Sequence, residues 1–399
     1  MIVEPKVWGF ICTTAHPTGC AAHVREQIRA VRQTGGQSAR GTKRALIIGA
    51  STGYGLAARI TAAFGYGAET LGVFFEKPGR GARTASAGWY NAAAFAAEAE
   101  AAGLRHWSLN GDAFSDAARA RAIEIILHDM GGPVDLVIYS LAAPARRMPD
   151  TGTLAQTALK PIGRAFRGRT IDTDRDCLTE LVLEPASEQE ISDTVVVMGG
   201  DDWARWMHAL KDAGALAADA TTVAFSYLGP EITRPIYRDG TIGRAKAHLE
   251  QTAAALRASG VDARIAVLKS IVTQASAAIP LIPLYLSLVF KVMKEQGLHE
   301  GALEQQQRLF RDFLYRADGA PATLDEAGRL RLDERELGEN VQQACQTLWP
   351  GITDDTLMSL TDYAGYKQDF LRLFGFGFAG VDYAAEVETQ ITIAGCTNV

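Results

Sequence analysis

From Arg44 onward the sequence alternates short apolar runs with alanine-rich helical stretches, and this alternation restricts the fold more than any other feature. A repeated strand, helix, strand order is the pattern of βαβ units, whose strands lie parallel and whose helices cover both faces of the sheet. The apolar runs predict six parallel strands, at residues 45–48, 70–75, 105–109, 134–139, 222–227 and 264–268. The predicted class is therefore α/β with a doubly wound parallel sheet.

Three segments depart from this rhythm. Residues 146–199 interrupt the core with glycines and prolines, and alternating residues at 170–183 predict an inserted hairpin. Residues 1–43 form an N-terminal extension in which 7–11 predict a hairpin or cap. Residues 276–399 predict extra C-terminal helices to about residue 373 and a short strand-like tail at 390–394. We expect one elaborated Rossmann-type domain over residues 1–399, whose dinucleotide-binding core is 44–145 and 200–275.

Composition excludes several classes of protein. With 47% hydrophobic and 22% charged residues the chain is neither disordered nor a small disulfide scaffold. The net charge is −6 and no basic block is present, so nucleic acid is not an expected partner. The most apolar stretch, residues 275–290, is too short and too broken by prolines to span a bilayer.

The cysteines and the start of the sequence bear on location. Five cysteines at irregular spacing favour reduced thiols over a disulfide framework. Residues 1–20 lack the basic start and long apolar run of a signal peptide. A cytoplasmic protein is therefore expected.

A glycine-rich turn follows the first predicted strand and precedes an apolar helix. It reads Gly49-Ala50-Ser51-Thr52-Gly53-Tyr54-Gly55. Glycines in this context allow backbone N–H groups to approach a pyrophosphate at a helix N-terminus. The turn predicts a dinucleotide site, against the alternative of a turn without a ligand.

The ends of the next strands carry further candidates. Glu76 follows the second strand, where a carboxylate accepts hydrogen bonds from the adenosine ribose and repels a 2′-phosphate, which favours NADH over NADPH. The neighbouring Lys77 and Arg80 weaken that discrimination. Asp112 is placed to meet an adenine amino group, or to be only a solvated loop residue. The small residues after Ser140 suit a close approach to a ribose, or simple turn packing.

Tyr237 and Lys246 are separated by eight residues downstream of the fifth predicted strand. The phenol of a tyrosine ordinarily has a pKa near 10, and a nearby ammonium that stabilises its phenolate makes it useful in proton transfer. The same lysine can hold a nicotinamide ribose. Tyr227 is a second phenol that can reach the same site, and the alternative is that either tyrosine is a core residue with a satisfied hydroxyl.

One competing constellation lies in the extension, where Cys12, His16, Cys20 and His23 stand close together in sequence. Such residues bind zinc when they converge. Their spacing matches no recognised finger, so we expect structural roles and no metal site.

These motifs together resemble those of the V-type enoyl-acyl-carrier-protein reductases and the related trans-2-enoyl-CoA reductases, enlarged members of the short-chain dehydrogenase/reductase superfamily. The likeness covers essentially the whole chain. It includes residues 9–20, the glycine-rich turn, the Tyr237 and Lys246 pair, residues 267–276, and residues 291–301. The long gap between the tyrosine and the lysine is its discriminating feature.

The resemblance implies a monomer that uses NADH to reduce the carbon–carbon double bond of a 2-enoyl thioester, the last reductive step of fatty-acid elongation. It implies Tyr237 as proton donor, Lys246 as a catalytic and cofactor-binding residue, and Tyr227 as a substrate contact. The implied cofactor residues are Gly49, Ala50, Ser51, Thr52, Gly53, Tyr54, Phe75, Glu76, Asp112, Ala113, Ser140, Leu141, Lys246, Ile271, Val272, Thr273, Gln274 and Ala275.

Residues 278–290 would wall the acyl chain, or be a plain core helix. Acyl carrier protein and coenzyme A both remain open as the carrier of the thioester. Two other functions remain as alternatives: a carbonyl (3-ketoacyl) reductase that uses the same tyrosine and lysine, and a non-catalytic module that senses dinucleotides.

Overall fold

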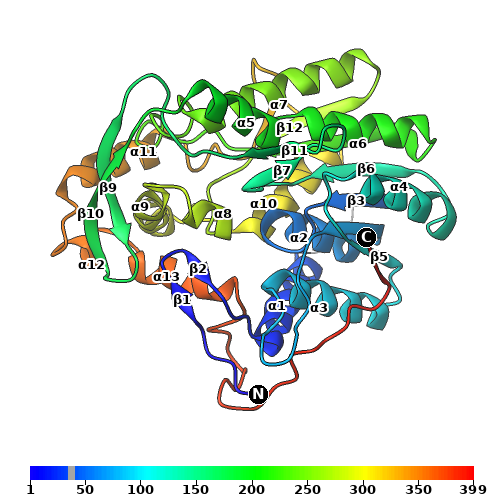
Figure 1. Ribbon diagram of the computed structural model, residues 1–399, viewed down its shortest axis with the longest axis horizontal. Coiled ribbons are helices and arrows are strands. Elements are labelled where there is room, and N and C mark those ends of the chain that lie inside the picture. The colour runs from blue at the N-terminus through cyan, green and yellow to red at the C-terminus, as the bar shows by residue number, and fades with distance from the viewer. Residues whose placement is uncertain (35–40) are drawn as a thin grey trace.

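A computed structural model describes residues 1–34 and 41–399 and shows a parallel sheet covered on both faces by helices (Figure 1). Residues 35–40 of the predicted extension lie outside the described residues. The sheet has eight strands in the order β13-β12-β11-β6-β3-β4-β5-β14. Six are the predicted strands: β3 (Arg44–Ile48), β4 (Glu69–Phe74), β5 (His106–Asn110), β6 (Val134–Tyr139), β11 (Leu216–Ser226) and β12 (Asp262–Val267). The doubly wound parallel sheet is confirmed.

The sheet has two more strands than the six that the sequence predicts, and each of them lies at an edge of the sheet. They are β13 (Arg329–Arg331), which pairs with β12, and β14 (Cys396–Asn398), which pairs with β5. The expected tail strand at 390–394 is wrong, because the pairing begins only at Cys396. Each edge strand has three residues and little apolar pattern, as is common where a sheet edge is kept short. Hydrophobic periodicity over three residues carries no usable signal.

Alternation along the strands explains the two layers of helices. In β3, Leu46 and Ile48 pack into a cluster with residues of α4 (Asp116–Glu124), α6 (Asp201–Asp212) and α7 (Thr241–Ala258). Ala45 and Ile47 face the opposite cluster, with residues of α2 (Gly53–Ile60), α3 (Ala87–Ala101) and α9 (Ile282–Glu295). Successive side chains of a strand point to opposite faces, so one apolar run supplies both cores.

The insertion contains the predicted hairpin, a second hairpin and a helix. Strands β9 (Phe166–Asp172) and β10 (Cys177–Leu183) pair antiparallel, and the hairpin begins a few residues earlier than expected. A second hairpin, β7 (Ala145–Arg147) with β8 (Leu154–Gln156), and helix α5 (Glu188–Met198) complete the segment. The long β9-β10 hairpin stands at the side of the molecule beside α9 and α11 (Glu339–Leu348) (Figure 1).

The extension and the C-terminal segment surround this core. Strands β1 (Val7–Trp8) and β2 (Ile11–Cys12) form the expected N-terminal hairpin before α1 (Pro17–Gln33). The remaining helical elements are α8 (Gln274–Ala277), α10 (Ala302–Arg308), α12 (Leu357–Leu360), α13 (Tyr363–Arg372), the π-helical turns at Thr61–Gly65, Ile125–Asp129 and Leu309–Leu314, and η4 (Trp349–Gly351). Within the described residues, none of the helices is long and apolar enough to cross a membrane.

The N-terminal histidines make specific contacts in the structure. His16 is fully buried, and its Nδ1 accepts a hydrogen bond from the N–H of Gly19, which caps α1. The ring of His23 stacks on Phe378 with centroids 5.3 Å apart. In the part of the chain that the structure describes, no group of three or more histidine, cysteine, aspartate or glutamate side chains is arranged to hold a metal ion.

We expect His23 to make folding pH-dependent. Burial, aided by Arg372 and opposed by Glu26, lowers the pKa of His23 to about 4. The unfolded chain therefore binds more protons between about pH 6.5 and 4, and stability falls as the pH drops through that window. The contribution is about 2 kcal/mol after allowance for partial solvent screening.

The measurement is urea unfolding at pH 7 and pH 4.5 for the wild type and for His23→Phe, which keeps an aromatic ring against Phe378. The variant should lose less stability on acidification. Equal losses in the two proteins would contradict the role assigned to His23.

Candidate active site

The sheet order places the predicted cofactor residues at one edge. From β3 the chain builds outward through β4 and β5, and then returns to β6 on the other side of β3 and continues through β11 and β12. Ligands of doubly wound sheets bind outside the carboxyl ends of the strands at such a reversal. Every predicted cofactor residue except Lys246 follows one of these strands, so the topology gathers them at this carboxyl edge of the sheet, where folds of this kind have their ligand crevice.

The glycine-rich turn requires its glycines. Gly49 has φ +90°, and a Cβ there would lie 2.0 Å from the carbonyl oxygen of Ser140. Gly53 has φ +51° and begins α2, while a Cβ on Gly55 would lie 1.9 Å from the carbonyl oxygen of Gly49. The side chain of Thr52 makes no capping hydrogen bond, which leaves the first amides of α2 available to an anion.

Glu76 lies beside the glycine-rich turn. Its Oε1 accepts a hydrogen bond from Ser51 Oγ at 2.7 Å, and a Cβ on Gly88 would meet Oε1 at 2.0 Å. Burial raises the pKa of Glu76, and hydrogen bonds from Ser86 and Ser51 oppose that change. The Glu76 carboxylate therefore lies beside the glycine-rich turn, and its contact with a ribose stays a prediction.

The backbone of Glu76 is held by neighbouring strands. The Glu76 N–H donates to Asn110 Oδ1 at 2.7 Å, and Asn110 Nδ2 donates both to the Glu76 carbonyl oxygen and to Asn398 Oδ1 at 3.0 Å. Asn398 belongs to the edge strand β14. The C-terminal strand thus supports the backbone position of Glu76.

The other strand-end candidates have the following surroundings. Phe75 is 74% exposed beside Glu76. Asp112 Oδ1 accepts from the Phe114 N–H at 3.0 Å, and the Ala113 carbonyl accepts from the Trp206 indole. Ser140 donates its N–H to the Ile48 carbonyl. The Asp112 contact gives that residue a role in its own loop, and its contact with adenine stays a prediction.

The stretch after β12 reaches the glycine-rich turn from the other side. Thr273 caps the short helix α8, and its hydroxyl and that of Ser276 accept each other's backbone N–H groups. A Cβ on Gly53 would lie 3.5 Å from Thr273 Cγ2. The structure therefore brings Thr273 against the turn, flanked by the predicted residues Ile271, Val272, Gln274 and Ala275.

Tyr237 lies in the loop that precedes α7, and Lys246 lies within α7 near its N-terminus. Tyr237 is 8% exposed, and its carbonyl oxygen accepts from the Gly243 N–H at 2.9 Å. Lys246 Nζ donates to the Phe225 carbonyl oxygen at 3.3 Å, near the end of β11. Burial lowers the pKa of Lys246 to about 8. The Lys246 ammonium donates its hydrogen bond to the backbone, so the expected stabilisation of a Tyr237 phenolate by Lys246 stays a prediction.

The two predicted phenols meet. The rings of Tyr227 and Tyr237 are 4.9 Å apart between centroids and stand edge to face at 76°. The Tyr227 hydroxyl donates to Glu336 Oε1 at 2.9 Å. Burial, with the charge of Glu336 as a second cause, raises the pKa of both phenols. Both therefore stay protonated near neutral pH.

Glu336 is a site residue that sequence reasoning missed. Its carboxylate is fully buried and accepts from the hydroxyls of Tyr227, Tyr285 and Ser270 on one oxygen and from the Ser270 N–H on the other, at 2.6–2.9 Å. A carboxylate is an acceptor at both oxygens, and these donors offset the cost of burying it. Glu336 lies in a run of charged residues, 333–336, that looks like a solvated loop in the sequence.

A second buried lysine lies in the same region. Lys269 is 2% exposed, its Nζ donates to the Ser270 carbonyl at 2.7 Å, and it lies 4.2 Å from the centre of the Phe290 ring. Burial lowers its pKa to about 8, although Glu336 and Glu300 oppose this. The Lys269 carbonyl accepts from the Tyr54 hydroxyl at 2.6 Å, which ties the loop after β12 to the glycine-rich turn.

Comparison with known proteins agrees with this geometry. Family models for the trans-2-enoyl-CoA reductase catalytic region and for the NAD(P)H binding domain of trans-2-enoyl-CoA reductase match residues 83–315 and 2–81. An enoyl-[acyl-carrier-protein] reductase [NADH] from Xanthomonas campestris pv. campestris (strain 8004) is 59% identical over 395 residues, 98% of each chain. The chain belongs to the enoyl reductase family of these proteins.

Two further members of this enoyl reductase family are similar along nearly the whole chain. An enoyl-[acyl-carrier-protein] reductase [NADH] from Pseudomonas putida (strain W619) is 59% identical over 391 residues, 98% of each chain. The crystal structure of Treponema denticola trans-2-enoyl-CoA reductase in complex with NAD superposes with a TM-score of 0.94 at 48% identity, over 97% of this chain and 98% of that one.

A third family model, described as an enoyl reductase FAD binding domain, matches residues 324–387. In this enoyl reductase the segment adds β13 to the sheet and packs α11 and α13 against α9. The residues after β13 include the buried carboxylates of Asp333 and Glu336, which would repel a pyrophosphate. These residues do not fit a flavin, and we derive no step through one.

The Glu336 network predicts a graded loss of stability. In Glu336→Gln an amide N–H₂ must face groups that already donate, so the free energy of unfolding should fall by about 2 kcal/mol. Tyr285→Phe is the matched control, because it removes only one of the donors and should cost about 1 kcal/mol. Urea unfolding at pH 7 measures both. A Glu336→Gln loss no larger than that of Tyr285→Phe would contradict the central place of the carboxylate.

Proposed function

We propose that this protein is an NADH-dependent reductase of the carbon–carbon double bond of trans-2-enoyl thioesters. The observation that carries the proposal is the pair of buried phenols, Tyr227 and Tyr237, on the segment that leaves the carboxyl end of β11, at the same edge of the sheet as the glycine-rich turn after β3. The names of the similar proteins, enoyl-[acyl-carrier-protein] reductase [NADH] and trans-2-enoyl-CoA reductase in complex with NAD, support the same reaction.

The residues around the crevice fit a nicotinamide dinucleotide. The open amides of α2 suit its pyrophosphate, Glu76 suits a ribose without a 2′-phosphate, and Ser140 and Thr273 flank the turn. When bound, NADH supplies the hydride that the β-carbon of the substrate receives. The predicted contacts of Ala50, Ser51, Asp112, Leu141 and Gln274 with the cofactor belong to this proposal.

Tyr237 is proposed as the proton donor. Negative charge develops on the thioester oxygen as the β-carbon is reduced, and a hydroxyl directed at that oxygen stabilises it. The raised pKa of Tyr237 keeps the phenol protonated, so it can donate a hydrogen bond and then a proton. The Lys246 ammonium, held at the end of β11, is proposed to bind the nicotinamide ribose.

Tyr227 is proposed to contact the substrate in a more limited way. Its hydroxyl hydrogen is already directed to Glu336, so donation to a thioester oxygen would break that bond. The main role proposed for Tyr227 is therefore to orient the substrate carbonyl and the Tyr237 ring, and not to donate a proton. Glu336 is the positioning residue that fixes this arrangement.

The finer assignments rest on the relatives. An acyl carrier protein is proposed as the natural carrier because the similar Xanthomonas and Pseudomonas proteins carry that name, whereas the Treponema denticola structure is named a trans-2-enoyl-CoA reductase. A cytoplasmic monomer remains our expectation. The competing carbonyl-reductase function is tested by NADH oxidation with crotonyl-CoA against acetoacetyl-CoA, and turnover of only the second substrate would overturn the proposal.

The phenols predict three distinct kinetic results. Tyr237→Phe removes a donor used in the transition state, so kcat should fall by roughly 10² or more while NADH binding persists. Lys246→Ala should weaken NADH binding and lower kcat together. Tyr227→Phe should be less damaging than Tyr237→Phe if the Tyr227 hydroxyl serves mainly to orient the substrate.

Steady-state rates with crotonyl-CoA and NADH affinity by fluorescence separate these effects. Tyr383→Phe is the control, because its hydroxyl donates to the Gly375 carbonyl, away from the crevice. Turnover of Tyr237→Phe near that of the control would remove Tyr237 from the mechanism.

Glu76 predicts the choice of cofactor. A buried carboxylate beside the ribose position repels a 2′-phosphate, so kcat/KM with NADPH should be more than 10-fold below that with NADH. Glu76→Ala should narrow this ratio by raising the value for NADPH. Equal use of both cofactors by the wild type would show that Glu76 does not select.

A further inference from the structure

A buried carboxylate on α6 joins two segments that carry predicted cofactor residues. Asp202 Oδ2 accepts a hydrogen bond from the Tyr139 hydroxyl at 3.0 Å, and Tyr139 ends β6 directly before Ser140. Asp202 Oδ1 accepts from Arg119 Nη1 at 2.9 Å. Arg119 lies on α4, which packs beside α6 and follows the loop after β5 (Figure 1). Asp202 therefore connects the segments that follow β5 and β6.

Arg119 and Trp206 hold the loop after β5 from its carbonyl side. Arg119 donates from Nη2 to the Phe114 carbonyl oxygen at 3.2 Å and from Nη1 to the Ala113 carbonyl oxygen at 3.5 Å. The Trp206 indole, on α6, donates to the same Ala113 oxygen at 3.0 Å. Both side chains are buried. Two consecutive carbonyl groups of the loop are thus bound by donors from the interior.

The carboxylate of Asp112 belongs to this loop and has one oxygen available. Its Oδ1 accepts from the Phe114 N–H at 3.0 Å. Among the described residues its Oδ2 has no hydrogen-bond partner, and the residue is half-buried. A carboxylate oxygen is an acceptor and the exocyclic amino group of adenine is a donor, so the two are complementary.

We propose that Arg119 and Asp202 are positioning residues for recognition of the adenine ring of the dinucleotide. Arg119 holds the 112–114 loop so that the Asp112 carboxylate meets the adenine amino group, and Asp202 holds Arg119. Both residues act through Asp112 and do not touch the ligand. The inference rests on the proposed function and names the residues behind the adenine end of that site.

A purely structural role for the ion pair is the competing interpretation. Arg146 Nη2 lies 3.7 Å from Asp202 Oδ1 and also donates to Asp201, so the cluster balances charge in the interior. The two interpretations differ in the effect of a substitution. A general loss of stability weakens the binding of all dinucleotides alike, whereas displacement of Asp112 weakens only the binding of those that carry the adenine amino group.

The test compares the binding of NADH with that of deamino-NADH, in which hypoxanthine replaces adenine and a carbonyl oxygen replaces the amino group. Burial raises the pKa of Asp202 to about 6, with Arg119 and Arg146 opposing, so measurements at pH 8 keep this carboxylate ionised. The wild type should bind NADH about 10-fold more tightly or better, because deamino-NADH loses the hydrogen bond and sets two acceptors against each other.

Arg119→Lys should reduce this preference to about 3-fold or less, because lysine keeps the charge but lacks the planar fork that reaches Asp202 and the loop together. Fluorescence titration measures both dissociation constants. At saturating NADH, kcat with crotonyl-CoA should stay within about 2-fold of wild type, because adenine lies at the end of the dinucleotide remote from the nicotinamide.

Arg121→Lys is the matched control, because Arg121 lies on the same helix and pairs with Glu124 at the surface. It should keep the wild-type preference. Urea unfolding shows whether each variant is folded. If Arg119→Lys does not fold, Asp202→Asn makes the same test, because it removes the charged partner of the guanidinium, and it should reduce the preference in the same way.

A mutant cycle tests whether Arg119 acts through Asp112. Asp112→Ala should abolish the preference for NADH, and the addition of Arg119→Lys should change the ratio of the two dissociation constants no further. A further change in that ratio would show that Arg119 acts elsewhere and would overturn the inference.

Two other results would also overturn it. One is equal affinity of the wild type for NADH and deamino-NADH. The other is an unchanged preference in Arg119→Lys, even with weaker binding of both ligands, which would make the role of Arg119 structural. Failure of the wild type to oxidise NADH with any enoyl thioester would instead refute the proposed function.

Discussion

The hydrogen bonds that converge on the Glu336 carboxylate connect segments that are distant in sequence. Ser270 follows β12, Tyr227 follows β11, Tyr285 lies on α9, and Glu336 itself follows the edge strand β13. Burying a carboxylate without these donors would cost free energy, so displacing any one of the donors would destabilise the folded protein. The result is a polar centre whose hydrogen bonds join four separate segments beside the crevice. The relative position of the two phenols depends on it.

Close backbone approach is the second constraint, and it acts on the cofactor side. The strand ends of β3 and β6 come so near that the Gly49 position has no room for a Cβ, and the start of α2 packs on the same turn. The amides that would meet an anion are therefore fixed before any ligand arrives. Preorganised groups of this kind bind without a large ordering cost.

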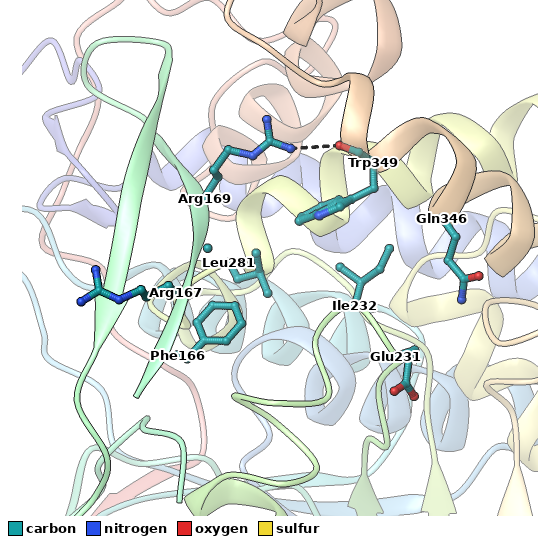
Figure 2. A pocket seen from close by; sticks show the side chains of 9 residues that line it. Phe166, Arg167, Arg169, Glu231, Ile232, Leu281, Gln346 and Trp349 are labelled. Carbon is teal, nitrogen blue, oxygen red and sulfur yellow. Dashed lines mark hydrogen bonds between the residues drawn. The ribbon is translucent and has the colours of Figure 1, made fainter. Parts of the chain in front are cut away.

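Much of the fold and the position of the glycine-rich turn could be predicted, because each depends on local sequence pattern. An apolar run such as 134–139 can be recognised as a strand, and glycines such as Gly49 and Gly53 as a turn, from a few neighbouring residues. The strand β13 and Glu336 could not be predicted, because the strand has three residues and the carboxylate is buried only by contacts with distant segments. A cavity lined by Phe166, Ile232, Leu281 and Trp349 (Figure 2) is built from four separate segments and leaves no sequence signature. The catalytic roles of Tyr237 and Lys246 are predicted from the spacing of the two residues and from the family resemblance.

The edge strand β14 has a consequence for the order of assembly. Asn398 supports Asn110, which in turn holds the backbone of Glu76, although the two asparagines are 288 residues apart. A chain leaves the ribosome with its N-terminal part first, and domains generally fold as units. The bracing of Glu76 by Asn110 and Asn398 can therefore be completed only after the last strand has emerged. A nascent chain would thus secure the backbone of Glu76, beside the glycine-rich turn, only at the end of its synthesis.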